Sequence, residues 1–301
     1  MESPREDREL SVTDLVQLGY GREKTQHILH LLEDEEILNY YLAQGKRHGC
    51  IPVTRVTEGY PSLLRQRLGG DAPGCLWAKG DLTLLNTPAI SLVGSRELGQ
   101  KNREFAEAVG IFAAQQRLAL ISGNARGADK AAQNACLEAG GRVISVVADS
   151  LTIHRLKENV LYLSENSFDE EFSAQRALSR NRCIHALGRI VFVAQADFGK
   201  GGTWDGTVKN LRHGWSPVVC FRDGSEAAAE GNQCHATTSY LCALRLSQKS
   251  NSITCKMSHH RPSWRCGQGR MRTTTTDGLV SVCKQPPTPR IVTNCKILCL
   301  I

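Results

Sequence analysis

A glycine-rich turn at residues 122–127 has the residue types and spacing that could hold a phosphate. It follows a short apolar run, 118–121, that is typical of a buried strand. From residue 128 the alanines recur on one helical face, and this helix is predicted to end at Gly140 and Gly141. The first N–H groups of a helix lack partners within it, and the helix dipole attracts anions there. We therefore predict phosphate contacts at Ser122, Gly123, Arg126 and Gly127. The alternative is an ordinary strand-to-helix turn in which Asp129 orders the first helical turn.

Two other loops, 94–96 and 199–203, carry glycine with a cation after an apolar run. Ligands of open parallel sheets bind outside the carboxyl ends of the strands, so the three loops are expected to share one edge. Arginine can grip a phosphate with two parallel hydrogen bonds. The predicted contacts in these loops and in a basic segment further along are Gly94, Ser95, Arg96, Arg180, Asn181, Arg182, Lys200, Gly201 and Gly202. Asn181 could equally cap a helix, and Trp204 could stack on a base or pack against the sheet.

The elements that would position these loops alternate between strand and helix patterns. Strands are predicted at 89–93, 118–121, 143–147, 160–163, 190–194 and 218–221, and helices at 103–116, 128–139, 176–187 and 204–212. This order predicts an α/β fold with a doubly wound, mainly parallel, Rossmann-like sheet. Three apolar sets between residues 10 and 45 predict a small N-terminal helical module, and residues 76–85 resemble a linker.

The charge of the chain is unevenly distributed. The chain has 37 Lys and Arg residues and 30 Asp and Glu residues. Residues 231–301 contain 10 of the basic residues but only 1 of the acidic ones, so the formal net charge of +7 comes from this tail. The basic tail therefore does not show that the body binds nucleic acid. The charged start of the chain predicts no signal peptide, and no apolar run approaches the length of a membrane span. A cytoplasmic protein is expected.

We expect three regions: an N-terminal helical module at 1–75, a Rossmann-like core at 76–230, and a basic, cysteine-rich tail at 231–301. The tail holds 7 of the 12 cysteines and shows no sustained period, which is typical of disorder. Zinc binding by Cys255, His259, His260 and Cys266 is the alternative, although these residues lack the close spacing of structural zinc sites. A third hypothesis is that the tail is translated out of its ancestral frame, since the composition changes abruptly after Glu230.

Taken in order, these loops resemble the motifs of the DNA-processing protein A family (DprA/Smf). The matching residues are Gly94-Ser95-Arg96, Ser122 to Asp129, Glu138 to Arg142, Ser164-Glu165, Ser179 to Arg182, Ile184 and Leu187-Gly188. The resemblance implies a non-catalytic, single-stranded DNA-binding protein, without a cofactor or a metal, that acts in recombination or natural transformation. It also implies two partners, a RecA-type recombinase that the protein helps to load and a second copy in a homodimer.

The sequence departs from the family pattern in the phosphate loop and in the tail. The family usually has an aliphatic residue at the position of Asn124 and isoleucine at that of Ala128. The segment between Asp149 and Arg180 is short, and the tail stands where many members carry a winged-helix module. These differences affect the phosphate loop, the segment after the third predicted strand and the tail. The surfaces for the two partners are therefore not assigned to residues of this sequence.

A related function remains as the alternative, because the wider superfamily includes enzymes that resemble LOG phosphoribohydrolases. Gly201-Gly202-Thr203 is similar to their phosphate loop, but the next residues are Trp204, Asp205 and Gly206, with no catalytic glutamate. Hydrolysis requires a general acid or base. We therefore expect a binding protein, with a nucleotide-binding or nucleotide-cleaving enzyme as the alternative.

Overall fold

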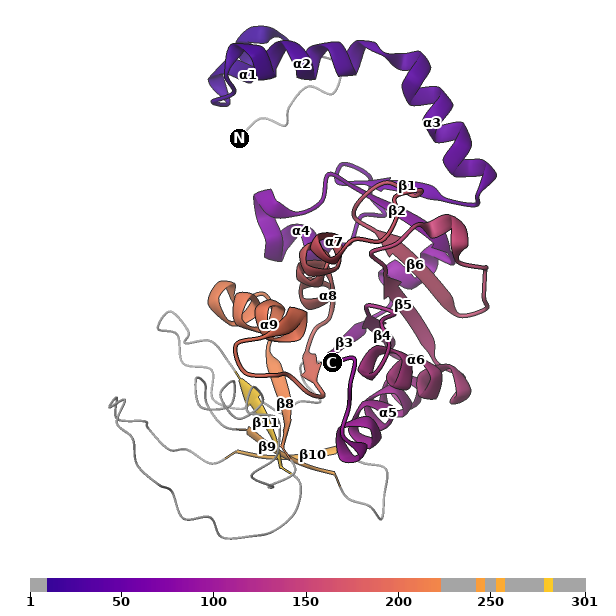
Figure 1. Ribbon diagram of the computed structural model, residues 1–301, viewed down its shortest axis with the longest axis vertical. Coiled ribbons are helices and arrows are strands. Elements are labelled where there is room, and N and C mark those ends of the chain that lie inside the picture. The colour runs from indigo at the N-terminus through magenta and orange to yellow at the C-terminus, as the bar shows by residue number, and fades with distance from the viewer. Residues whose placement is uncertain (1–9, 223–241, 247–252, 258–278, 284–301) are drawn as a thin grey trace, which may run out of the picture. The chain divides into compact units, whose positions relative to one another are not determined.

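The computed structural model describes residues 10–222, 242–246, 253–257 and 279–283 (Figure 1). The contacts between residues divide the chain into two compact units, Met1–Gly49 and Cys50–Ile301, which are described separately. Among the described helices, none has both the length and the apolar composition needed to cross a membrane.

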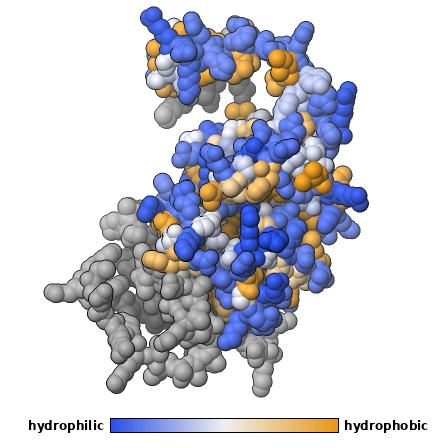
Figure 2. All heavy atoms as spheres, in the orientation of Figure 1, coloured by the Kyte–Doolittle hydropathy of each residue, from blue (hydrophilic) through white to orange (hydrophobic). Residues whose placement is uncertain are grey.

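The first unit contains the three helices that the apolar pattern predicts: α1 (Val12–Gln17), α2 (Arg22–Glu33) and α3 (Glu35–Arg47). Ser11 and Asp14 form a capping box at the start of α1. Asp34 ends α2 and caps α3 by accepting a hydrogen bond from the Ile37 N–H at 3.1 Å. Several large apolar side chains of this unit are exposed and appear as orange patches over α1–α3 (Figure 2).

The second unit is built on one sheet with a parallel centre, which confirms the predicted fold class. Its strands follow the order β1-β2-β6-β5-β4-β3-β7-β8-β11-β9-β10, and β6 through β8 in this order are parallel. The parallel strands are β3 (Ala89–Val93), β4 (Ala119–Ser122), β5 (Arg142–Val146), β6 (Val160–Ser164), β7 (Val191–Val193) and β8 (Val218–Arg222). All six lie where the sequence predicts them. Most of their residues are buried on both faces, as in other sheets of this kind.

Helices cover both faces of the sheet (Figure 1). On one face α5 (Gln100–Gln115) packs against α6 (Ala128–Glu138), and on the other α8 (Asn181–Leu187) packs against α4 (Ser62–Leu68) and α9 (Gly201–His213). The predicted helix 176–187 is divided at Arg180 into α7 (Ala174–Ser179) and α8, because the Arg180 side chain turns into the interior. Gly201 and Gly202 belong to the first turn of α9 and not to the loop before it.

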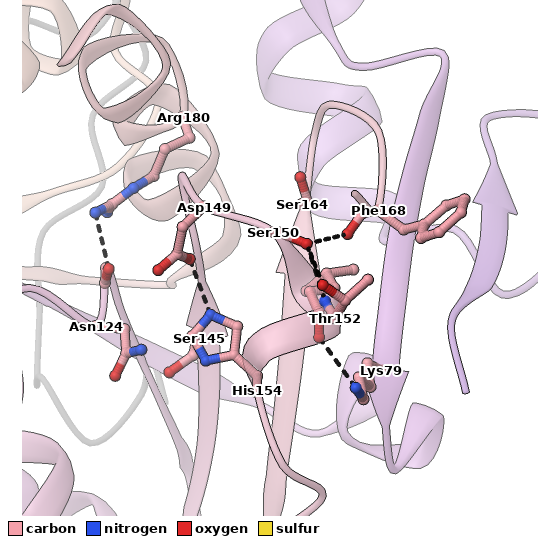
Figure 3. A network of polar contacts seen from close by, with 12 residues as sticks. Lys79, Asn124, Ser145, Asp149, Ser150, Thr152, His154, Ser164, Phe168 and Arg180 are labelled. Atoms are coloured by element: carbon pink, nitrogen blue, oxygen red, sulfur yellow. Dashed lines mark hydrogen bonds and ion pairs between the residues drawn. The ribbon is translucent and has the colours of Figure 1, made fainter. Parts of the chain in front are cut away.

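The prediction of a linker at residues 76–85 is wrong. β2 (Cys75–Gly80) pairs with β6 and with β1 (Ile51–Thr54), both antiparallel, and it is followed by a 3₁₀ helix, Leu82–Asn86. Lys79 is buried within β2 and donates to the carbonyl of Leu151 at 3.0 Å (Figure 3). A lysine and a glycine in so short a run hide the strand pattern, so the predicted boundary at residue 75 falls inside the sheet.

The tail contributes three short strands to the opposite edge of the sheet. β11 (Leu279–Cys283) pairs antiparallel with β8, and β9 (Cys242–Leu246) and β10 (Ile253–Met257) follow outward. The sequence shows no sustained alternation here, so these strands were not predicted. Three of the four residues in the zinc hypothesis, His259, His260 and Cys266, lie outside the described residues. Disorder of the rest of the tail stays a prediction.

Candidate functional site

A cavity of about 680 Å³ opens at the carboxyl edge of the parallel strands. It lies at β3, whose neighbours β4 and β7 extend the sheet in opposite directions, which is the point where open α/β sheets bind ligands. Its walls include Gly94, Ser95, Arg96, Arg126, Arg180, Asn181, Lys200, Gly201 and Gly202. These are nine of the thirteen residues that the sequence predicts. We call this cavity the cleft.

A smaller cavity of about 200 Å³ adjoins the cleft and shares four residues with it. The shared residues are Arg96, Ala125, Arg126 and Arg180, and the smaller cavity adds Gly123, Asn124, Ala148, Asp149 and Phe172. We call it the side pocket. The two cavities therefore lie side by side across the ends of β3, β4 and β5.

Hydrogen bonds between distant loops hold the cleft together. The Ser95 N–H donates to the carbonyl of Gln195 at 2.9 Å, and the Gly99 N–H donates to the Gln195 side chain at 3.1 Å. The Ala128 N–H, at the start of α6, donates to the carbonyl of Ser95 at 3.2 Å. Gly94 has no room for a side chain, because a Cβ there would overlap with that of Ala128. The loop after β3 is thus fixed between α6 and the loop after β7.

Gly127 packs against the same loop, the one that follows β3. Its φ is +80°, a value that glycine adopts more easily than other residues, and a Cβ would overlap with the carbonyl oxygens of Ser95 and Arg96. These contacts lie within the protein and not in the open cleft. The geometry therefore gives Gly127 a packing role that does not depend on a phosphate.

Replacing Gly127 by alanine is expected to destabilise the fold more than the same change at Gly140. Both glycines have positive φ, +80° and +73°, but no atom lies within 4 Å of a Cβ at Gly140. Only Gly127→Ala adds the overlap, and the ψ of −123° at Gly127 lies outside the left-handed region that other residues can adopt, so this variant should cost about 1–3 kcal/mol more. Urea denaturation of both variants measures this difference. Equal losses of unfolding free energy in the two variants would show that the loop around Ser95 moves aside without an energetic penalty.

Two N–H groups of the predicted phosphate loop are already occupied. A carboxylate oxygen of Asp129 accepts from the N–H groups of Gly123 and Ala125, both at 3.1 Å. Burial is the largest influence on the pKa of Asp129 and raises it, while Arg180 and these two N–H groups oppose that rise. Within the described residues, only the N–H groups of Asn124, Arg126 and Gly127 in this turn remain without a hydrogen bond.

Arg180 is a buried structural group although it borders both cavities. Its side chain donates to the carbonyl of Gly123 at 2.8 Å, and the residue is 6% exposed. Burial lowers the pKa of Arg180, whereas the nearby carboxylates of Asp129 and Asp149 raise it. A Cβ at Gly123 would overlap with the Arg180 guanidinium, so this glycine makes room for the arginine. The Arg180 side chain thus joins α8 to the turn after β4.

The other predicted residues divide between the cleft and the interior. Arg96, Arg126 and Lys200 are exposed on the cleft, and none of them forms an ion pair with a described residue. The Asn181 amide donates to the carbonyl of Gly202 at 3.0 Å and so joins α8 to α9. Three predicted residues line neither cavity. Gly127 packs against the loop after β3, Ser122 is buried and accepts from Gln133 at 2.5 Å, and Arg182 pairs with Glu165 at 3.1 Å.

The region that contains the cleft matches a known protein family. A family model for DNA recombination-mediator protein A matches residues 52–215, more than half of the sequence and all of the cleft. The chain belongs to this family. DNA processing protein DprA of Streptococcus pneumoniae is 36% identical over 141 residues, which are 44% of this chain and 50% of that protein. The chain spans about half the length of the curated relatives that it matches.

Solved structures of the family share the fold. The X-ray structure of DNA processing protein A from Streptococcus pneumoniae gives a TM-score of 0.62 at 26% identity, over 76% of this chain and 81% of that chain. DNA processing protein A from Helicobacter pylori gives a TM-score of 0.52 at 22% identity, over 61% and 85%. The second likeness concerns the fold alone.

Two exposed aromatic residues at or beside the two cavities were not predicted from the sequence. Phe172 is 56% exposed and forms a wall of the side pocket, and Phe198 is 53% exposed in the loop before Lys200. The Phe198 ring packs edge-on against Trp204 with 4.9 Å between centroids. Phe198 could have been predicted, because it directly precedes the glycine and lysine of a predicted binding loop. Phe172 and Asp149 gave no such signal, because only the fold brings them to the cavity.

Proposed function

We propose that this chain binds single-stranded DNA along the cleft and acts in recombination, in keeping with its family. The observation that carries the proposal is the set of three exposed cations, Arg96, Arg126 and Lys200, which approach one cavity from three loops. Cations that form no ion pair with the described residues are available to phosphates. A positive groove that follows the backbone is the main requirement for binding a single strand.

Exposed aromatic rings supply the second requirement, a surface on which bases can stack. Phe172 lies in the side pocket and Phe198 lies in the loop that leads to Lys200. Both rings are more than half exposed although large apolar groups favour burial. Their placement beside the three cations favours nucleic acid over a compact anion such as free phosphate.

Two further considerations support a strand over a mononucleotide. The cleft and the side pocket share four residues, so successive nucleotides can occupy them without a gap. The Helicobacter pylori protein, which has the same fold, binds single-stranded DNA. The family resemblance also implies a RecA-type recombinase and a second copy of the chain as partners, and both stay predictions.

We propose a non-catalytic role because the carboxylates at the cleft are poorly suited to acid–base catalysis. Asp129 accepts two backbone hydrogen bonds and is 6% exposed, while Glu97 and Asp197 are exposed to solvent. No glutamate follows the Gly201-Gly202 turn in the first turns of α9. The alternative, hydrolysis of a nucleotide, would need one of the exposed carboxylates to act as the general acid or base.

A titration against a single-stranded 20-mer, its duplex and AMP is the direct test of this function. We expect the single strand to bind best, the affinity to rise with strand length, and the logarithm of the affinity to fall linearly with that of the salt concentration. AMP should bind weakly and remain intact. Cleavage of AMP, or equal affinity for AMP and the 20-mer, would contradict the proposal and favour the enzyme.

A further inference from the structure

We propose that the side pocket binds a guanine base of the strand, with Asn124 and Asp149 contacting the Watson–Crick edge of the base. This inference rests on the proposed function and adds a base preference to it. Both residues line this cavity together with Arg180, and Figure 3 shows Asp149 between Arg180 and His154, with Asn124 on the neighbouring turn.

The side pocket is small enough to favour a single base over a larger ligand. Its volume of about 200 Å³ is below the roughly 300–1,000 Å³ of pockets for drug-sized ligands. The exposed Phe172 ring provides a stacking wall, and Arg96 and Arg126 border the pocket where it joins the cleft. A base can therefore enter the pocket while its phosphates stay beside the two arginines.

Asn124 presents a hydrogen-bond donor to this pocket. Its φ of +59° is rare for a residue other than glycine and places it at the tip of the turn after β4. The Lys130 ammonium group donates to the Asn124 side-chain oxygen at 2.5 Å, so the amide oxygen is engaged. The NH₂ group has no hydrogen bond within the described residues and remains available to a ligand.

Asp149 presents an acceptor from the end of β5. One of its carboxylate oxygens accepts from the His154 ring at 2.8 Å, and that ring stacks on Tyr162 with 4.6 Å between centroids. The His154 side chain is 11% exposed, whereas that of Asp149 is 32% exposed and reachable from the pocket. Burial acts to raise the pKa of Asp149, but the hydrogen bond and charge of His154 outweigh it and lower that pKa. The carboxylate is therefore ionised at neutral pH and only accepts hydrogen bonds.

Guanine complements this pair better than the other bases. Its edge has the O6 acceptor beside two donors, N1–H and the 2-amino group, so O6 can accept from Asn124 while both donors reach Asp149. Adenine and cytosine each offer one amino donor with a neighbouring acceptor. Thymine places its single N3–H between two carbonyl oxygens, one of which would face the carboxylate. The expected order is guanine, then adenine and cytosine, then thymine.

The test compares 20-mers in which thymine alternates with guanine, with hypoxanthine (which lacks the 2-amino group), or with thymine itself. A two-donor contact should favour guanine by roughly tenfold. Since only half of the binding registers place the alternate base in the pocket, we expect about fivefold tighter binding of the guanine strand in low, potassium-free salt. The hypoxanthine strand should lose most of this gain, because its base lacks one of the two donors.

Variants assign the preference to the two residues. In Asp149→Asn the amide oxygen can accept from His154, so its NH₂ would face the guanine donors, and the preference should disappear while binding of the thymine strand is kept or tightened. Asn124→Leu should reduce the preference through loss of the O6 contact. Asp71→Asn, a change at an exposed residue that lines neither cavity, should leave the preference intact.

Each outcome decides the inference. Equal binding of the thymine and guanine strands, or an unchanged preference in a folded Asp149→Asn protein, would overturn the guanine pocket and leave single-strand binding standing. Failure to bind any strand would overturn the proposed function itself. A thermal melt of each variant separates lost recognition from lost folding.

Discussion

Replacing Arg180 by leucine is expected to lower the free energy of unfolding by about 1–3 kcal/mol, because it leaves the buried carbonyl of Gly123 without its donor and removes a positive charge that favours the ionised form of the buried Asp129. Arg180 and Asp129 are both 6% exposed, and the arginine also holds the carbonyl of Gly123 at 2.8 Å. Loss of this residue should therefore act on folding before it acts on DNA. Urea denaturation measures the effect.

A double-mutant cycle separates the charge effect from packing. Asp129→Asn keeps an oxygen that can accept from the N–H groups of Gly123 and Ala125. The double variant with Arg180→Leu removes both charges and should recover part of the stability lost in Arg180→Leu alone, whereas the hydrogen bond to Gly123 stays lost. A stable Arg180→Leu protein with weakened DNA binding would instead make Arg180 a phosphate ligand, as the sequence alone suggests.

The double change Arg96→Ala and Arg126→Ala should have the largest effect on binding. Each phosphate contact of a single strand contributes about 0.7 to the slope of log affinity against log salt, so the slope should fall by about 1.4. Both side chains are exposed, and neither forms an ion pair with a described residue, so the fold should be unaffected. Titrations of a thymine 20-mer at several salt concentrations give the slope.

Lys209→Ala is the matched control for this variant. Lys209 is an exposed cation on α9 that pairs with Asp205 at 2.8 Å and borders neither cavity. Its loss should leave the slope unchanged. Equal slopes in the double variant and the unmodified protein would show that the strand does not cross the cleft.

The sequence predicts the parallel sheet well because buried strands and amphipathic helices differ in period. The six parallel strands and the loop at 94–96 are local patterns of this kind. β2 was missed, since Lys79 interrupts its apolar run and finds its partner, the carbonyl of Leu151, only in the folded chain. The antiparallel strands of the tail show no clear alternation, so the sequence does not predict them.

The sequence predicts where the candidate site lies better than it predicts the role of each residue. Glycine and arginine in a strand-end loop indicate an anion site, but they do not show whether an arginine faces solvent or the interior. Arg96 and Arg180 are alike in sequence, yet one is exposed and the other is 6% exposed. Similarly, no local pattern brings Phe172 and Asp149 to the same cavity as Asn124.

The hydrogen bonds between Ser95, Gly99 and Gln195 join parts of the chain about a hundred residues apart. No short peptide therefore contains the cleft, because residues 94–127 carry two of its loops and residues 195–203 carry the third. The binding surface comes into being only when β3 and β7 have paired. Recognition is thus tied to the pairing of β7 with β3, and a chain released before β7 is made would carry the loops at 94–96 and 122–127 and still lack the cleft.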